Sequence, residues 1–292
     1  MRARLKQRPS HNLRYPRAAM PPPQLRLPPG ACDCHMHVYE DRYPLVPQAT
    51  FKPPHAPLAD YLQVQRALGL SRAVVVQPNG YGFDNRCTLA ALSALGATAR
   101  AVATVALDVT EGELERLTSA GVRGVRFHLL PGGMLAWDAL APLAARIAPF
   151  GWHVQLQLDG RELPRYEAAL AQLPVPLVID HNGKFLEPVA IDHPGFKTLL
   201  RLIAAGNTWV KLSAPYETSR LGPPHYADVG ALATALVRAN PGRCVWASNW
   251  PHPGRDPRPD SAALLELLRE WAPDEATRQR ILVDNPAALY GF

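Results

Sequence analysis

The 292-residue sequence contains no uninterrupted apolar run of about 18 residues, which is the length that a helix needs to cross a bilayer. No predicted strand is followed by Gly-x-Gly-x-x-Gly or by Gly-x-x-x-x-Gly-Lys-Ser/Thr, which argues against the nucleotide-binding classes that carry those loops. The basic N-terminus lacks the apolar stretch of a secretory signal. We therefore expect a cytoplasmic protein without a membrane partner.

Cysteine is scarce, and none of the four cysteines stands in a Cys-x-x-Cys sequence. They are Cys32, Cys34, Cys87 and Cys244. Scattered cysteines of this kind are typical of reduced packing residues in a cytosolic protein, and they do not indicate a disulfide framework.

Acidic residues are absent from the first 29 positions, which hold seven Arg and Lys residues. The net charge of +6 therefore belongs to this arm, and the rest of the chain is close to neutral. Such an arm favours a flexible start over a nucleic-acid contact, and Met20 is an alternative initiator within it. We predict a basic, proline-rich, flexible arm over residues 1–29 and a single domain over residues 30–292, with no nucleic acid as partner.

Apolar strand-like runs alternate with amphipathic helical segments along residues 30–292. The predicted strands cover residues 31–38, 72–77, 101–106, 124–128, 153–158, 176–181, 208–212 and 244–248. The predicted helices cover 58–68, 86–95, 111–120, a segment ending near 150, 163–173, 194–205, 226–239, 261–271 and 274–282. Eight such units predict an α/β fold of the (β/α)8 TIM-barrel type, with an open doubly wound sheet as the rival. The proline-rich residues 43–57 are long enough for a lid over a site.

The first predicted strand carries the sequence Asp33-Cys-His35-Met-His37. Side chains alternate along a strand, so this spacing predicts His35, His37 and Asp33 on one face and the two cysteines on the other. Two imidazoles on one face suit metal binding, proton transfer or polarisation of a carbonyl.

Polar residues recur where the predicted strands end, which in a barrel is the face that holds the active site. They are His35, His37, Gln77, Asn79, Arg126, His128, Gln155, Gln157, His181, Lys211, Asn249 and His252. Their recurrence at one end of successive strands is hard to explain by packing alone, so the pattern indicates an enzyme.

Several of these motifs together resemble the amidohydrolase superfamily. The resemblance rests on Asp33-Cys-His35-Met-His37, Gly124-Val-Arg126-Phe, Val178-Ile-Asp-His181-Asn-Gly, Trp246-Ala-Ser-Asn249-Trp-Pro-His252 and the C-terminal Asp284-Asn-Pro-Ala-Ala-Leu-Tyr-Gly-Phe292. The branch is the one that contains 2-pyrone-4,6-dicarboxylate lactonase. The resemblance implies a barrel enzyme that acts on small carboxylated lactones, usually without a bound metal.

Within that branch, the chain resembles the D-galactarolactone isomerases more closely than the lactonase. The shared features are Leu130-Pro-Gly-Gly133, His181-x-Gly183-Lys184-Phe185, Tyr216-Glu217-x-Ser219-Arg220, Tyr226-Ala-Asp-Val229 and Asn249-Trp-Pro-His252. Asn249 stands where the lactonases have a catalytic aspartate, and their additional arginine is missing near Gly132. His35 departs from the isomerases, which have glutamine there.

The resemblance and the residue types together assign roles to the candidates. We predict the catalytic residues His35, His37, His181 and Asn249, with His181 or His35 as the base, His37 and Arg126 polarising the carbonyl, and Asn249 orienting a hydroxyl. The predicted substrate-binding residues are Arg126, Asn79, Gln155, Gln157, Lys184, Lys211, Tyr216, Arg220 and His252, among which arginine suits a carboxylate clamp.

The predicted reaction is the intramolecular isomerisation of a small, carboxylated, aldaric-type sugar lactone, without a cofactor. A metal-independent lactonase is the nearest alternative, since a histidine can also activate water. A mononuclear hydrolase with one Zn2+ on His35, His37 and His181 is a second alternative. A catalytically silent binding protein is the third, and the costly buried polar groups argue against it.

Overall fold

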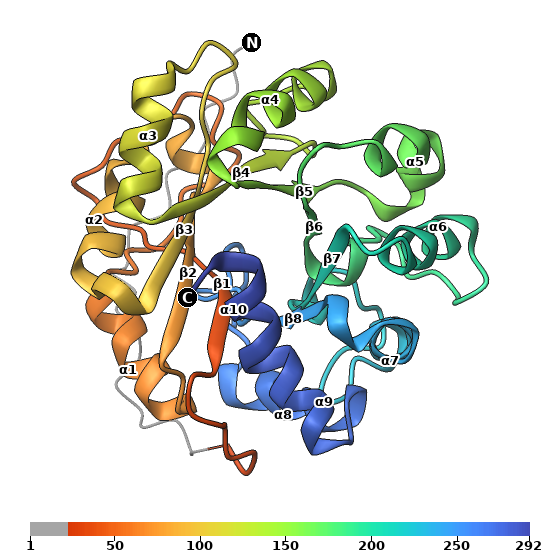
Figure 1. The fold of residues 1–292 in the computed structure, drawn as a ribbon. Helices are drawn as coiled ribbons and strands as arrows, with labels where there is room; N and C mark the ends of the chain where they lie inside the picture. The colour runs from red at the N-terminus through yellow and green to blue at the C-terminus, as the bar shows by residue number, and fades with distance from the viewer. Residues whose placement is uncertain (1–22) are drawn as a thin grey trace, which may run out of the picture.

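The computed structural model describes residues 23–292, in which eight parallel strands form one sheet (Figure 1). The strands are β1 (Cys32–Met36), β2 (Arg72–Val76), β3 (Ala99–Ala103), β4 (Val122–His128), β5 (His153–Gln157), β6 (Leu177–Ile179), β7 (Thr208–Leu212) and β8 (Cys244–Trp246). Each strand pairs with the next in the sequence. A parallel bridge between Met36 and Trp250 joins the two ends of the sheet, so the predicted (β/α)8 barrel is confirmed.

Helices surround the strands, as the ring of coiled ribbons in Figure 1 shows. They are α1 (Leu58–Leu68), α2 (Arg86–Leu95), α3 (Glu111–Ala120), α4 (Leu140–Ile147), α5 (Leu163–Ala171), α6 (Pro194–Ala204), α7 (Ala227–Ala239), α8 (Ser261–Trp271), α9 (Glu275–Gln279) and α10 (Asn285–Tyr290). Helix α3 illustrates the local signals, because the Thr110 side chain accepts a hydrogen bond from the Glu113 amide and Gly121 ends the helix at a φ of 103°. Across residues 23–292, no helix is both long and apolar enough to span a membrane.

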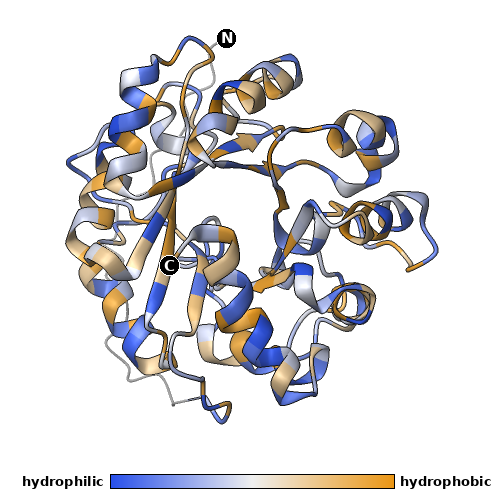
Figure 2. Cartoon of the chain, viewed as in Figure 1, coloured by the Kyte–Doolittle hydropathy of each residue, from blue (hydrophilic) through white to orange (hydrophobic). Residues whose placement is uncertain are grey.

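Apolar side chains fill two separate regions. The larger lies between the strands and the helices, whose inner faces carry the hydrophobic colour in Figure 2. The smaller fills the barrel interior with side chains such as Val74, Val102, Val178 and Val245, and Tyr290 of α10 joins it. His153, at the start of β5, packs against Tyr290 in this cluster.

The first strand does not keep the predicted alternation. A register shift between Asp33 and Met36 lets Cys32 and Cys34 join the apolar interior, although the histidines that follow also point inward. Asp33 instead accepts hydrogen bonds from Ser248 and from Tyr61 of α1. The predicted facing of Asp33 and the cysteines was therefore wrong. All four cysteines are buried and unpaired, as expected.

The N-terminal prediction lies mostly outside the described residues, because residues 1–22 and with them Met20 are not among them. Over residues 23–29 the chain runs along the folded body. Leu25 and Leu27 pack against the core, and the Leu25 amide donates a 2.7 Å hydrogen bond to Glu266 of α8. The division at residue 29 stays a prediction.

Candidate active site

A cavity of about 150 Å³ opens at the carboxyl ends of the strands. Its lining comes from nearly every side of the barrel and consists of His37, Tyr39, Thr50, Phe51, Pro53, Asn79, Gly80, Arg126, His128, Gln157, His181, Glu217, Asn249 and Pro253. Thr50, Phe51 and Pro53 belong to the proline-rich loop that was predicted as a lid. The cavity is therefore a mixed polar and apolar site for a small molecule.

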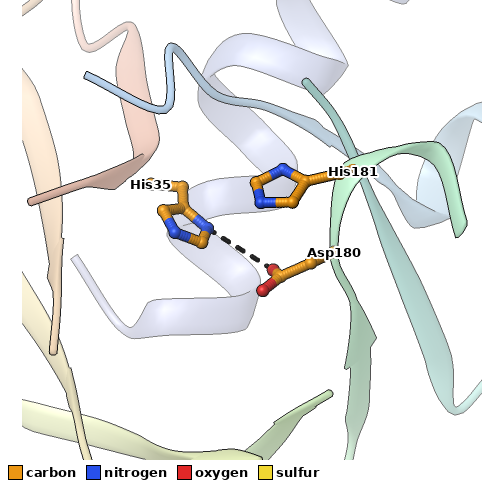
Figure 3. A group of neighbouring side chains, drawn as sticks. All are labelled: His35, Asp180 and His181. Carbon is orange, nitrogen blue, oxygen red and sulfur yellow. Dashed lines mark ion pairs between the residues drawn. The ribbon is translucent and has the colours of Figure 1, made fainter. Parts of the chain in front are cut away.

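Three fully buried polar side chains form a network around His35. The Lys211 ammonium donates to Gln155 Oε1 at 2.6 Å and lies 3.5 Å from Asp180 Oδ1. Gln155 Nε2 donates to Asp180 Oδ2 at 3.0 Å. Figure 3 shows Asp180 and His181 together on one side of the His35 ring. The single negative charge of Asp180 is thus balanced by the single positive charge of Lys211.

Burial lowers the pKa of His35, His37 and His181 well below the ordinary value of 6.5. Lys211 adds to this lowering at His35 and Arg126 adds to it at His37, while the Asp180 carboxylate acts in the opposite direction on all three pKa values. The three imidazoles are therefore neutral near pH 7, and each carries one ring proton.

The hydrogen bonds determine where two of these protons lie. His37 Nδ1 is 2.8 Å from the Val76 carbonyl, which can only accept, so the His37 proton is on Nδ1. The bare His37 Nε2 must then accept from His35 Nε2, 3.1 Å away. This leaves His35 Nδ1 as an acceptor for the Lys211 ammonium at 3.3 Å. Both histidines have their protons committed to other protein groups.

His181 differs from the other two histidines. It follows β6 at a left-handed φ of 52°, within the 3-10 turn η6 (His181–Gly183). Its Nδ1 is 2.8 Å from the Ser213 hydroxyl, and its Nε2 has no hydrogen-bond partner among residues 23–292. Because His181 also lines the cavity, its free ring nitrogen can exchange a proton with a bound molecule.

Arg126 of β4 is 6% exposed and also lines the cavity. Its Nη1 donates to the Gln77 carbonyl at 2.8 Å and its Nη2 to Gln157 Oε1 at 3.1 Å. Its Nε has no hydrogen-bond partner, and across residues 23–292 no carboxylate forms an ion pair with it. A buried guanidinium held only by neutral oxygens favours an incoming anion.

Asn249 lies across the barrel from Arg126, because β4 and β8 are four strands apart. Its Nδ2 donates to Tyr216 Oη at 2.9 Å and to Glu217 Oε1 at 3.1 Å. Tyr216 Oη in turn contacts His252 Nδ1 at 3.0 Å. Since a carboxylate accepts only, the contact with Glu217 fixes the orientation of the amide and turns its oxygen away from Glu217.

The structure places the predicted site residues in three groups. His37, His181, Asn249, Arg126, Asn79 and Gln157 line the cavity. His35, Gln155, Lys211, Lys184, Tyr216 and His252 lie behind the lining and contact it or one another. The Arg220 side chain is 72% exposed and pairs with Glu187 at 3.7 Å, outside the cavity.

Several residues of the site were not among the predicted ones. Asp180, Glu217, Tyr39 and Thr50 are the polar members of this group, while His128 was recognised as a strand-end residue but was given no role. The position of Asp180 directly before His181, at the end of a strand, was the available signal, and Glu217 stands next to the predicted Tyr216. Burial lowers the pKa of His128 to about 3, so this residue adds another neutral imidazole to the wall.

The donor atoms of His35, Asp180 and His181 lie within 4.8 Å of one another, which is the grouping that a metal ion would use. The set differs from the predicted alternative because Asp180 takes the place of His37. The Lys211 ammonium, however, lies against two of these three residues, 3.5 Å from Asp180 Oδ1 and 3.3 Å from His35 Nδ1. A cation already among the donors opposes a divalent ion, so the cluster fits a metal poorly.

Comparisons with known proteins cover the whole barrel. The sequence model of a family described as Amidohydrolase matches residues 32–292. The D-galactarolactone isomerase of Agrobacterium fabrum is 39% identical over 273 residues, which are 92% of this chain and 93% of that protein. The 2-pyrone-4,6-dicarboxylate hydrolase of Comamonas testosteroni is 36% identical over 281 residues, 92% of either chain. An apo crystal structure from Agrobacterium tumefaciens, 38% identical, superposes with a TM-score of 0.88 and covers 92% of this chain and 98% of its own.

Proposed function

The chain belongs to the amidohydrolase family, as its motifs predicted, and from that premise we propose that it isomerises a small, carboxylated, aldaric-type sugar lactone. The observation that carries the proposal is the buried Arg126 guanidinium, which faces a small cavity without a carboxylate partner among the described residues. A lactone derived from a sugar diacid keeps one free carboxylate, and this group would complete the pairing of Arg126. The names of the relatives, a lactone isomerase and a lactone-ring hydrolase, support the choice of a lactone.

The proton chemistry favours His181 as the group that moves the proton. A hydroxyl of the substrate would give its proton to His181 Nε2 while its oxygen attacks the lactone carbonyl. The old ring C–O bond then breaks, and the departing oxygen takes the proton back from Nε2. No water is consumed. The Ser213 hydroxyl, 2.8 Å from Nδ1, supports the imidazolium that forms between the two steps.

The other two histidines are less suited to direct roles than the sequence predicted. The only ring proton of His37 is held by the Val76 carbonyl, so a neutral His37 has none to donate to a substrate carbonyl. His35 does not line the cavity. We assign both to positioning, with Arg126 as the fixed charge of the site.

Asn249 favours isomerisation over hydrolysis. Its amide cannot take up a proton near neutral pH, so it cannot activate water as an aspartate would. Its nitrogen is already used by Tyr216 and Glu217, which leaves its oxygen to accept a hydrogen bond from a substrate hydroxyl. An attacking hydroxyl tethered to the substrate needs no captured water.

Turnover in 18O-labelled water tests this reaction. We expect an aldarolactone to give a second lactone of unchanged mass and altered proton NMR spectrum, without label. The Asn249→Asp variant should shift the product towards the labelled open-chain acid, because it restores a carboxylate base. Label incorporation by the wild-type enzyme at the rate of turnover would identify a lactonase and contradict the isomerase proposal.

We also expect the enzyme to work without a metal, because Lys211 already places a positive charge among the candidate ligands. Protein purified without added metal should contain well under one equivalent of zinc by elemental analysis, and its turnover should survive a chelator. Stoichiometric zinc whose removal abolishes turnover, and whose return restores it, would instead support the mononuclear hydrolase.

A further inference from the structure

The cavity carries charge of opposite sign at its two ends. Among the described residues that line it, Arg126 is the only one with a permanently positive side chain, and Glu217 is the only acidic one. The neighbouring imidazoles of His37, His128 and His181 are neutral because burial lowers their pKa. A bound molecule therefore meets a cation on the β4 side and a carboxylate beside β8.

Glu217 is built firmly into its end of the cavity. It lies in the 3-10 turn η7 (Pro215–Glu217) after β7, and its side chain is 12% exposed. One carboxylate oxygen contacts the Lys184 ammonium, and the other accepts from Asn249 Nδ2 at 3.1 Å. Its backbone carbonyl accepts from Arg255 Nη2 at 2.9 Å. These contacts hold the carboxylate at the wall.

Glu217 also forms an ion pair with Lys184, the second cation near the site. Burial, followed by the repulsion of Arg255, lowers the pKa of Lys184 to about 8, while the Asp180 carboxylate acts in the opposite direction. The Lys184 ammonium is thus charged near pH 7, but it is already paired with the Glu217 carboxylate. Lys184 does not line the cavity, so a ligand reaches Glu217 rather than the lysine.

We propose that Glu217 is a specificity-determining residue that excludes a second anionic group and so restricts the enzyme to lactones with one free carboxylate. This inference rests on the proposed function, because it names which lactones the site accepts. A single carboxylate pairs with Arg126, while hydroxyls at the other end donate to Glu217 and Asn249. A second carboxylate placed there would face Glu217 in a partly desolvated site, and like charges in such contact are strongly unfavourable.

The test compares two ligands that share a hydroxylated six-carbon skeleton. D-gluconate has one carboxylate, and D-glucarate has a second in place of the terminal hydroxymethyl group. Neither is a lactone, so their binding by calorimetry or ligand-observed NMR does not depend on turnover. We expect the wild-type protein to bind gluconate at least about tenfold more tightly than glucarate, as a like-charge contact predicts.

The Glu217→Gln variant keeps the shape of the side chain and a hydrogen-bond acceptor for Asn249, and it frees Lys184. We expect this variant to lose or reverse the preference for gluconate. Adding Lys184→Met should remove the gain for glucarate, because the freed ammonium is its source. Glu217→Asp keeps the negative charge and should keep the preference. Glu187→Gln is the matched control, since the Glu187 side chain is 60% exposed and lies outside the cavity.

Three results would overturn the inference. They are equal or tighter binding of glucarate by the wild-type protein, an unchanged preference in folded Glu217→Gln, and no binding of gluconate at millimolar concentration. If Glu217→Gln fails to fold by circular dichroism, loss of the preference in Glu217→Asp would count against the charge as its cause. A protein that shows the predicted binding but converts no aldarolactone would refute the proposed reaction alone.

Discussion

Replacement of Arg126 by methionine should reduce kcat/KM for the lactone by on the order of 10³-fold, because a buried charge that pairs with a substrate carboxylate is removed. Methionine has a similar length and no charge, so the protein should still fold. The neutral partners of Arg126, the Gln77 carbonyl and Gln157 Oε1, would lose one hydrogen bond each but would not be left as buried charges. Steady-state kinetics and a thermal unfolding curve measure the two effects separately.

Arg220→Met is the matched control for this experiment. Both arginines were predicted to bind substrate, but the Arg220 side chain is 72% exposed and pairs with Glu187. Its loss should leave kcat/KM within the error of the measurement. Near wild-type kinetics in a folded Arg126→Met variant would remove Arg126 from the site, and a large loss in Arg220→Met would show that the outer loops close over the ligand.

Replacement of His181 by glutamine should lower kcat by on the order of 10³-fold, in the range expected for loss of a general acid–base group. A glutamine amide can still contact Ser213, but it cannot take up the hydroxyl proton. The KM should change far less than kcat, because the carboxylate clamp at Arg126 remains. Rapid kinetics on one lactone should measure kcat and KM for the wild-type enzyme, for His181→Gln and for His225→Gln, which is the matched surface control.

The pH profile of the wild-type enzyme gives a second readout for His181. Burial lowers the pKa of His181 well below its ordinary value of 6.5, so the neutral, proton-accepting form persists as the solution is acidified through 6.5. The acid limb of kcat/KM should therefore lie well below pH 6.5. A limb at or above that value, or a His181→Gln variant with nearly full kcat, would exclude His181 as the base.

Much of the barrel could be predicted from the chain alone because its signals are local. The apolar run of β2 and the amphipathic spacing of α1 are set by neighbours within a few residues, and the predicted bounds of α1, α2, α3, β7 and α8 are those observed. The weaker signals failed at element ends. Strands β6 and β8 end two residues before the predictions, and the last predicted helix passes at residue 280 into a π-helical stretch over residues 280–284.

The site could be predicted only in its residue types. His37, Arg126, His181 and Asn249 were recognisable from their motifs at strand ends, and they do meet in one cavity. The facing of Asp33 was wrong because a single register shift in β1 changes which side chains point inward. No local sequence pattern in β1 predicts such a register shift.

The sequence by itself determined the eightfold strand and helix order, the family and the end of the barrel that holds the polar residues. Only the tertiary structure decided which charges are free. Lys184 is paired with Glu217, which lies 33 residues further along the sequence. Lys211 contacts His35, from which it is 176 residues distant in the sequence. Arg126 keeps its charge without a carboxylate partner among the described residues. Periodicity is fixed by neighbours along the chain, whereas an ion pair or a histidine tautomer depends on atoms that only folding brings within about 3 Å.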